Sequence, residues 1–122
     1  MATQPIPGPF ALPRSAAEAD LLAKYFRGLG DPTRVRILEL LEARGEMSVG
    51  ELVEGVGEPQ PKVSNHLACL RWCGFVVGDR HGRSIRYRIA DPRVSQLVTL
   101  GRGLLADNAE HVAACRRIGS AC

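Results

Sequence analysis

The chain has 122 residues, of which 45% are hydrophobic and 24% are charged, and its formal net charge is +3. This length allows one compact domain and excludes two of ordinary size, and the composition is typical of a globular protein. No apolar run approaches the ~18 residues of a membrane-spanning helix, and residues 1–13 lack the basic start and apolar centre of a secretory signal, so we expect a cytoplasmic protein without membrane contact.

Three helices are predicted in the first half of the chain, behind a proline-rich arm. We expect residues 1–14 to be disordered and a first helix to span about residues 15–28. Asp31 followed by Pro32 is a cap-plus-proline signal that opens a second helix, which stops near Gly45. The capping box of residues 48–51 opens a short third helix.

A fourth helix is predicted over residues 60–73. Gln60 followed by Pro61 repeats the cap-plus-proline signal, and Gly74 is a suitable terminating glycine. The apolar residues at three- and four-residue spacing form one stripe that should be buried, and they are Val63, Leu67 and Leu70. The polar residues of the first turns are left outside this stripe.

From Phe75 the apolar period changes to two, which predicts two strands with a turn around residues 81–83. Asp91 followed by Pro92 then caps a last helix of about six turns, and residues 116–122 are expected to form a tail. The domain of residues 15–115 is therefore predicted to be mainly α with a small β-hairpin, in the order of a winged helix-turn-helix. The first and last helices carry apolar stripes that this unit cannot cover, which predicts a two-fold homodimer through them.

Several side chains of the fourth helix are suited to reading double-stranded DNA. Gln60 and Asn65 can hydrogen-bond adenine edges, Ser64 can reach bases or phosphate, and Lys62 can neutralise backbone charge. His66 is a further candidate for DNA contact, and a packed or capping histidine is the equal alternative.

Positive charge concentrates on the predicted hairpin, where Asp79 is the only neighbouring acid. Five basic residues lie within nine positions: Arg80, His81, Arg83, Arg86 and Arg88. Such a cluster suits a polyanion such as DNA, and the alternative is an ordinary solvated hairpin face. At the turn, Arg83 is placed to enter a minor groove, whereas Arg86 and Arg88 are placed for phosphates and Tyr87 should face the core.

Three segments, in this order, resemble those of ArsR/SmtB-family repressors. Residues 30–38 (GDPTRVRIL) resemble the opening signature, residues 62–71 (KVSNHLACLR) the recognition helix and residues 82–87 (GRSIRY) the wing, and the match covers about residues 18–112. Members of this family are dimeric repressors that leave operator DNA when a metal ion or metalloid binds. The resemblance therefore implies a homodimeric repressor with a metal inducer.

Cys69 and Cys73 lie four residues apart on the fourth helix, which places their Cβ atoms ~5–6 Å apart on one face. Two thiolates at this spacing can hold one soft metal ion, and the alternative is a pair of small buried hydrophobes. Residues 67–74 (LACLRWCG) resemble the sensor helix of the CmtR subgroup, which responds to cadmium and lead. This resemblance implies Cys69 and Cys73 as ligands, with Cys115 as the third, from the same or the other subunit.

Three thiolates accept cadmium, lead, mercury or arsenite, and the sequence does not choose among them. Cys122 is either a spare ligand or a passenger at the chain end. Other family members bind zinc-type ions on the last helix. Asp107, Glu110 and His111 lie close together there in this sequence, but the second histidine of such a site is missing.

A thiol-redox or persulfide switch on the same fold is the alternative function. No phosphate loop, carboxylate pair or cysteine–histidine motif is present, so we do not expect an enzyme.

Overall fold

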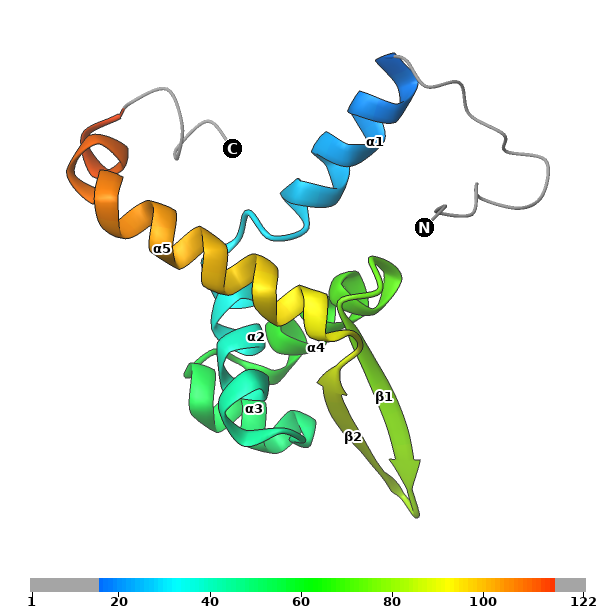
Figure 1. Cartoon of the computed structure of the whole chain (residues 1–122). Coiled ribbons are helices and arrows are strands. Elements are labelled where there is room, and N and C mark those ends of the chain that lie inside the picture. Colours follow the sequence, from blue (N-terminus) through cyan, green and yellow to red (C-terminus); the bar gives the residue numbers. More distant parts are fainter. Residues whose placement is uncertain (1–15, 116–122) are drawn as a thin grey trace.

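The computed structural model describes residues 16–115, and these form five helices and one hairpin (Figure 1). The elements are α1 (Ala16–Arg27), α2 (Pro32–Arg44), α3 (Val49–Val56), α4 (Gln60–Trp72), β1 (Val76–His81), β2 (Ser84–Ile89) and α5 (Pro92–Ala114). This confirms the predicted element order and the winged helix-turn-helix fold class. The predicted arm and tail, with Cys122, lie outside the described residues. None of the described helices is both long and apolar enough to cross a membrane.

Three of the predicted helix starts have the expected caps. At the start of α5, Asp91 accepts a hydrogen bond of 2.8 Å from the backbone N–H of Arg93. Asp31 accepts hydrogen bonds from the backbone N–H groups of Thr33 (2.8 Å) and Arg34 (3.3 Å), and Ser48 and Glu51 form the predicted capping box of α3. The predicted cap at Gln60 is wrong, because this residue is the first of α4 and no side chain caps the helix. Pro61 has no backbone N–H, which leaves one group fewer for a cap to satisfy.

The core lies between α2, α3, α4 and the base of the hairpin. The predicted stripe of α4 is confirmed, since Val63, Leu67 and Leu70 are 0%, 2% and 0% exposed. Helix α3 approaches α2 closely at Gly55, where a Cβ atom would lie 2.7 Å from a methyl of Leu40. The other buried hydrophobic residues are Ile37, Leu38, Leu41, Met47, Leu52, Phe75, Val76 and Val94. This packing holds α4 firmly along its whole buried side.

The two strands of the hairpin are antiparallel, with Val76 opposite Ile89 and His81 opposite Ser84. Gly82 turns the chain with a φ of +63°, a conformation that favours glycine. Tyr87 packs against the core, as predicted, and its ring lies across Gly78, where a Cβ atom would come within 3.1 Å of it.

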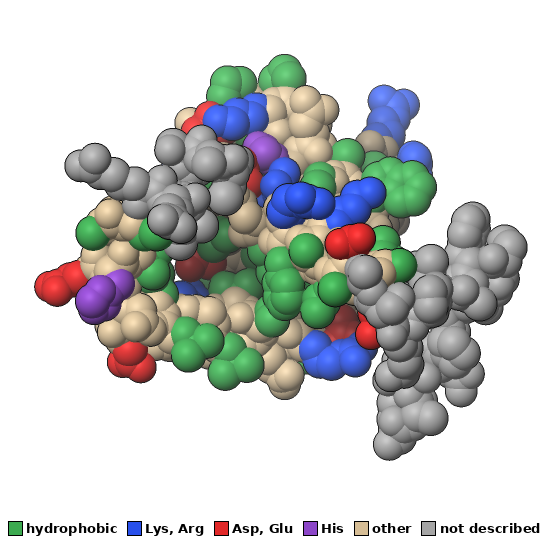
Figure 2. Space-filling model, turned by 90° about the horizontal axis from the view of Figure 1, so that it is seen from above, with side chains coloured by type: hydrophobic (Ala, Val, Ile, Leu, Met, Phe, Trp, Pro, Cys, Tyr) green, Lys and Arg blue, Asp and Glu red, His purple; other side chains and the backbone are tan. Residues whose placement is uncertain are grey.

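Helices α1 and α5 lie on one side of the α2–α4 body, and the hairpin projects from the opposite side (Figure 1). Large hydrophobic side chains remain exposed on both helices, and Figure 2 shows such side chains spread over this face. They include Leu21, Leu22 and Phe26 of α1, and Leu100, Leu104, Leu105 and Val112 of α5. The fold thus leaves uncovered the apolar surface that the sequence assigned to a dimer interface.

Candidate functional site

The first turns of α4 present the predicted DNA-reading side chains to solvent. Gln60, Lys62, Ser64 and Asn65 are all exposed. The Lys62 ammonium lies 3.1 Å from a Glu58 carboxylate oxygen, and within residues 16–115 the other three side chains make no hydrogen bond. Three of these exposed polar side chains are therefore free to meet a partner, and Lys62 is paired with Glu58.

His66 lies differently, because its ring points into the protein. The Nδ1 atom is 3.3 Å from the Arg34 guanidinium, the Nε2 atom is 3.6 Å from the Asp31 carboxylate, and the side chain is only 14% exposed. Burial raises the pKa of Asp31, but the N–H groups of Arg34 and Thr33 and the charges of His66 and Arg34 lower it more, so that it lies below its ordinary value. These contacts favour the packed-histidine interpretation over a contact with a base.

Arg34 joins three helices, and the sequence analysis missed it. Its Nε donates a hydrogen bond of 2.7 Å to the Gly28 carbonyl, and its Nη2 donates one of 3.1 Å to the Arg27 carbonyl. These carbonyls end α1, where cationic side chains are favourable. Because Arg34 also contacts His66, it connects the end of α1 with the middle of α4. The only local signal was an arginine close behind the Asp31 cap.

Cys69 lies in the last turn of α4 and Cys73 is the C-cap that follows it, and both are free, half-buried thiols. Burial raises the pKa of the Cys73 thiol, and the neighbouring Cys69 raises it further, against a lowering by the charges of Arg34 and Lys24. A Cβ atom at Gly28 would lie 3.1 Å from the Cys73 sulfur. The Cys73 thiol therefore faces the junction of α1 and α2, where Arg34 binds.

Cys115 does not join this pair within one chain. It ends α5 and is half-buried. Among residues 16–115, no three cysteine, histidine or acidic side chains come together in a way that could hold a metal ion. A three-thiolate site that includes Cys69 and Cys73 thus needs a thiol from elsewhere. The same finding covers Asp107, Glu110 and His111, which are exposed on α5.

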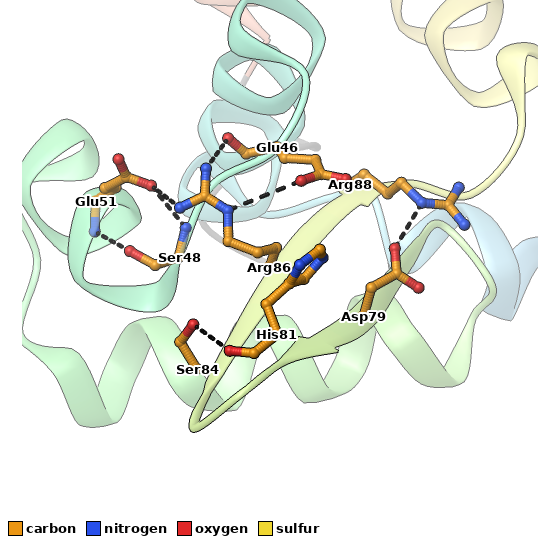
Figure 3. Close-up of polar contacts among 8 residues, drawn as sticks. All are labelled: Glu46, Ser48, Glu51, Asp79, His81, Ser84, Arg86 and Arg88. Atoms are coloured by element: carbon orange, nitrogen blue, oxygen red, sulfur yellow. Dashed lines mark hydrogen bonds and ion pairs between the residues drawn. The ribbon is translucent and has the colours of Figure 1, made fainter.

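The hairpin arginines divide into two kinds. Within the described part of the chain, Arg80 and Arg83 are exposed and make no ion pair or side-chain hydrogen bond. Arg88 pairs with Asp79 at 2.8 Å, and Arg86 donates a hydrogen bond of 3.0 Å to Glu51 (Figure 3). The free guanidiniums therefore lie nearest the turn, and the paired ones nearer the body.

Known proteins share both the sequence and the fold of this chain. Residues 31–77 match the model of a family described as bacterial regulatory protein, arsR family. A probable mercury resistance operon repressor of Streptomyces lividans is 48% identical over 99 residues, which cover 81% of this chain and 78% of the relative. The transcriptional regulator CmtR of Mycobacterium tuberculosis is 45% identical over 75 residues, or 62% of this chain and 63% of that protein.

A solved structure with a similar fold comes from Mycobacterium bovis. It is a homodimeric winged helix-turn-helix DNA-binding domain, described as a possible ArsR-family regulator. The TM-score is 0.68 and the sequence identity is 32%, over 88% of this chain and 92% of that one. The similarity thus covers most of both chains.

Proposed function

The chain belongs to the arsR family of bacterial regulatory proteins, and on that premise we propose that it is a homodimeric repressor that leaves operator DNA when a soft thiophilic ion binds its cysteines. Family and relatives are transcriptional regulators, in agreement with the expectation of a non-enzyme. One observation carries the proposal: a single helix holds exposed polar groups in its first turns and a half-buried thiol pair in its last. Since the proposed target is operator DNA of a bacterial regulator, we expect it to act in the cytoplasm.

The proposed DNA interface consists of the first turns of α4 and the tip of the β1–β2 hairpin. We call this hairpin, residues 76–89, the wing. Gln60, Ser64 and Asn65 would read base edges in a major groove, with Lys62 on a phosphate. Arg83, exposed at the wing tip, would enter the adjacent minor groove. His66 and Arg86 contribute less to this interface, because internal groups hold both side chains.

A second copy of the chain is the proposed cover for the apolar faces of α1 and α5. Support comes from their exposed leucines and from the homodimeric relative of the same fold. A two-fold dimer through these helices would present two copies of α4 to successive major grooves.

The proposed inducer site is formed by Cys69 and Cys73 with Cys115 of the partner subunit. The pair is free and half-buried, and Cys115 of the same chain does not approach it. Three thiolates suit cadmium, lead, mercury and arsenite. Mercury is the first ion to test, because the relative of Streptomyces lividans is a probable mercury resistance operon repressor.

Release of DNA follows from linkage between the two sites. An ion that binds the DNA-free arrangement more tightly weakens DNA binding by the same coupling free energy, typically ~1–3 kcal/mol. The proposed path is short. Cys73 faces Gly28, the Gly28 carbonyl binds Arg34, and Arg34 contacts His66 on α4.

The test uses a duplex that the protein selects from a random-sequence pool. Mercury, cadmium, lead and arsenite are added one at a time under anaerobic conditions, and DNA release is measured. Trp72, the only tryptophan, is 92% exposed beside Cys73, so its fluorescence reports ion binding separately. We expect release from the wild type and from the control Ala68→Ser, and none from Cys69→Ser. Release of the Cys69→Ser protein by the same ion, or release by oxidant or persulfide alone, would overturn the metal site.

A mixed dimer tests whether the third thiol comes from the partner. Chains with Cys69→Ser and Cys73→Ser are combined with chains carrying Cys115→Ser, neither of which has a complete site alone. If Cys115 acts across the dimer, the mixture regains one site per heterodimer and binds the ion tightly. If it acts within its own chain, the mixture binds no better than its parts.

A further inference from the structure

The wing joins the body of the protein at one point of its backbone. Tyr87 and Met47 exchange two backbone hydrogen bonds, of 2.8 and 3.0 Å, and both side chains belong to the core or pack against it. Beyond this bridge, residues 80–84 are all exposed. The direction of the outer wing is therefore determined at its base.

The Arg86 side chain makes a second attachment beside this bridge. Its Nη1 donates a hydrogen bond of 3.0 Å to Glu51, its Nη2 donates one of 3.1 Å to the Glu46 carbonyl, and its Nε lies 3.8 Å from the Glu46 carboxylate. Figure 3 shows the guanidinium turned away from the wing tip, toward α3 and the loop before it. Its donors are thus directed at the protein rather than at a ligand.

Glu51 is itself held in place by the capping box of α3. The carboxylate oxygen that meets Arg86 also accepts a hydrogen bond of 2.8 Å from the Ser48 backbone N–H. This N–H, and after it the charge of Arg86, hold the pKa of Glu51 below its ordinary value. The helix start therefore presents a fixed, charged group to the wing.

Arg88 provides an internal contrast to Arg86. It pairs with Asp79, which lies on the other strand of the same hairpin, so this pair cannot orient the hairpin against the body. Among the ion pairs of residues 16–115, only that of Arg86 with Glu51 crosses from the wing to α3 (Figure 3).

We propose that Arg86 is a positioning residue, which fixes the angle between the wing and α3 through Glu51 and Glu46 and thereby places Arg83 for DNA. The inference rests on the proposed docking of the wing on DNA. Arg83 lies three residues beyond Arg86, about 10 Å along an extended strand. A small rotation at the base therefore moves the Arg83 guanidinium by an ångström or more, which is enough to misplace a hydrogen bond.

Removing the negative charge of Glu51 distinguishes the two possible roles of this residue, because they predict opposite changes in DNA affinity. Glutamine can replace glutamate in a capping box, so Glu51→Gln keeps the start of α3 but loses the ion pair with Arg86. Glu54→Gln is the matched control, because Glu54 is exposed on the same helix and has no ion pair or side-chain hydrogen bond within residues 16–115. If Glu51 only repelled DNA, both substitutions would raise the affinity.

Affinity for the selected duplex is measured against salt concentration. For Arg86→Gln and Glu51→Gln we expect a loss of about fivefold each, which corresponds to ~1 kcal/mol, and the double variant should lose no more than either single one. The salt dependence should stay that of the wild type. In contrast, Arg83→Gln should also reduce the slope by about 1, because it removes a positive charge that lies in the DNA minor groove.

The outcomes test two claims separately: the positioning role of Arg86 and the docking of the wing on DNA. An affinity of Glu51→Gln equal to or above the wild type, or a reduced salt slope for Arg86→Gln, would overturn the positioning role. A wild-type affinity and slope for Arg83→Gln would instead overturn the docking of the wing. An affinity of Glu51→Gln below the wild type, with Glu54→Gln at or above it, supports the positioning role of Arg86.

Discussion

The two ends of α4 differ in what holds their polar side chains. In the first turns, Ser64 and Asn65 are exposed and make no hydrogen bond within the described residues. In the later turns, His66 and Cys73 face the end of α1, through Arg34 and Gly28. One helix of 13 residues thus has an end that can adapt to a ligand and an end that is connected to the rest of the protein.

A continuous buried side joins these two ends. Because Val63, Leu67 and Leu70 are all buried along α4, we expect the helix to move as one body. Asn65 and Cys73 are eight residues apart, or about 12 Å along the axis. A displacement imposed on the thiols is therefore expected to reach the DNA-reading side chains with little loss.

The largest expected effect is on the free energy of unfolding, which should depend strongly on the buried side of α4 and little on its exposed side. Leu70→Ala should lower the free energy of unfolding by ~2–5 kcal/mol, because it leaves a cavity at a residue that is 0% exposed. Ser64→Ala should change it by no more than ~0.5 kcal/mol. Denaturant unfolding measures both values. A comparable cost for Ser64→Ala would show that the first turns are not as free as the structure describes them.

The next effect distinguishes the residues that bind DNA from the residues that bind the ion. Asn65→Ala should weaken binding to the selected duplex by ~1–3 kcal/mol and leave the ratio of affinities with and without the ion unchanged. Cys73→Ser should do the reverse, with wild-type affinity for DNA and no response to the ion. Fluorescence anisotropy of labelled DNA measures all four quantities. If both variants change the same quantity, the two ends of α4 do not have separate functions.

Local patterns in the sequence account for the elements and for the exposed end of α4. Caps, glycines and the apolar stripe each depend on residues within one or two turns, and the sequence displays them directly. The contacts of Arg34 with His66 and of Arg86 with Glu51 join residues 32 and 35 positions apart, so no local pattern indicates them. In the proposed inducer site, the place of Cys115 depends in addition on a second copy of the chain. Sequence reasoning thus identified polar side chains of α4 that the structure leaves exposed, and missed the internal contacts of Arg34 and Arg86.

A smaller effect tests the connection between the thiols and the rest of α4. Lysine cannot reproduce the forked contacts of Arg34, so Arg34→Lys should weaken the coupling between ion and DNA by ~0.5–2 kcal/mol. The ratio of DNA affinities with and without the ion measures this coupling. Arg36→Lys is the matched control, since Arg36 is exposed on the same helix without an ion pair or side-chain hydrogen bond in residues 16–115. If the ratio of DNA affinities with and without the ion were the same in Arg34→Lys as in the wild type, the coupling would not depend on Arg34.

The smallest effect concerns the charge of Asp31, which caps α2 and lies beside His66. The pKa of Asp31 is lowered in the folded protein, so its charge stabilises the fold above the ordinary value of 3.8, and this stabilisation is lost as the pH falls through the lowered pKa. Asparagine keeps the cap without the charge, so Asp31→Asn should lower the free energy of unfolding at neutral pH by ~0.3–1 kcal/mol. Urea unfolding of both proteins at neutral and acid pH measures the difference, which should vanish once Asp31 is protonated. A difference that persists unchanged in acid would instead assign the effect to the geometry of the cap, and His66 would then be held by Arg34 rather than by the Asp31 charge.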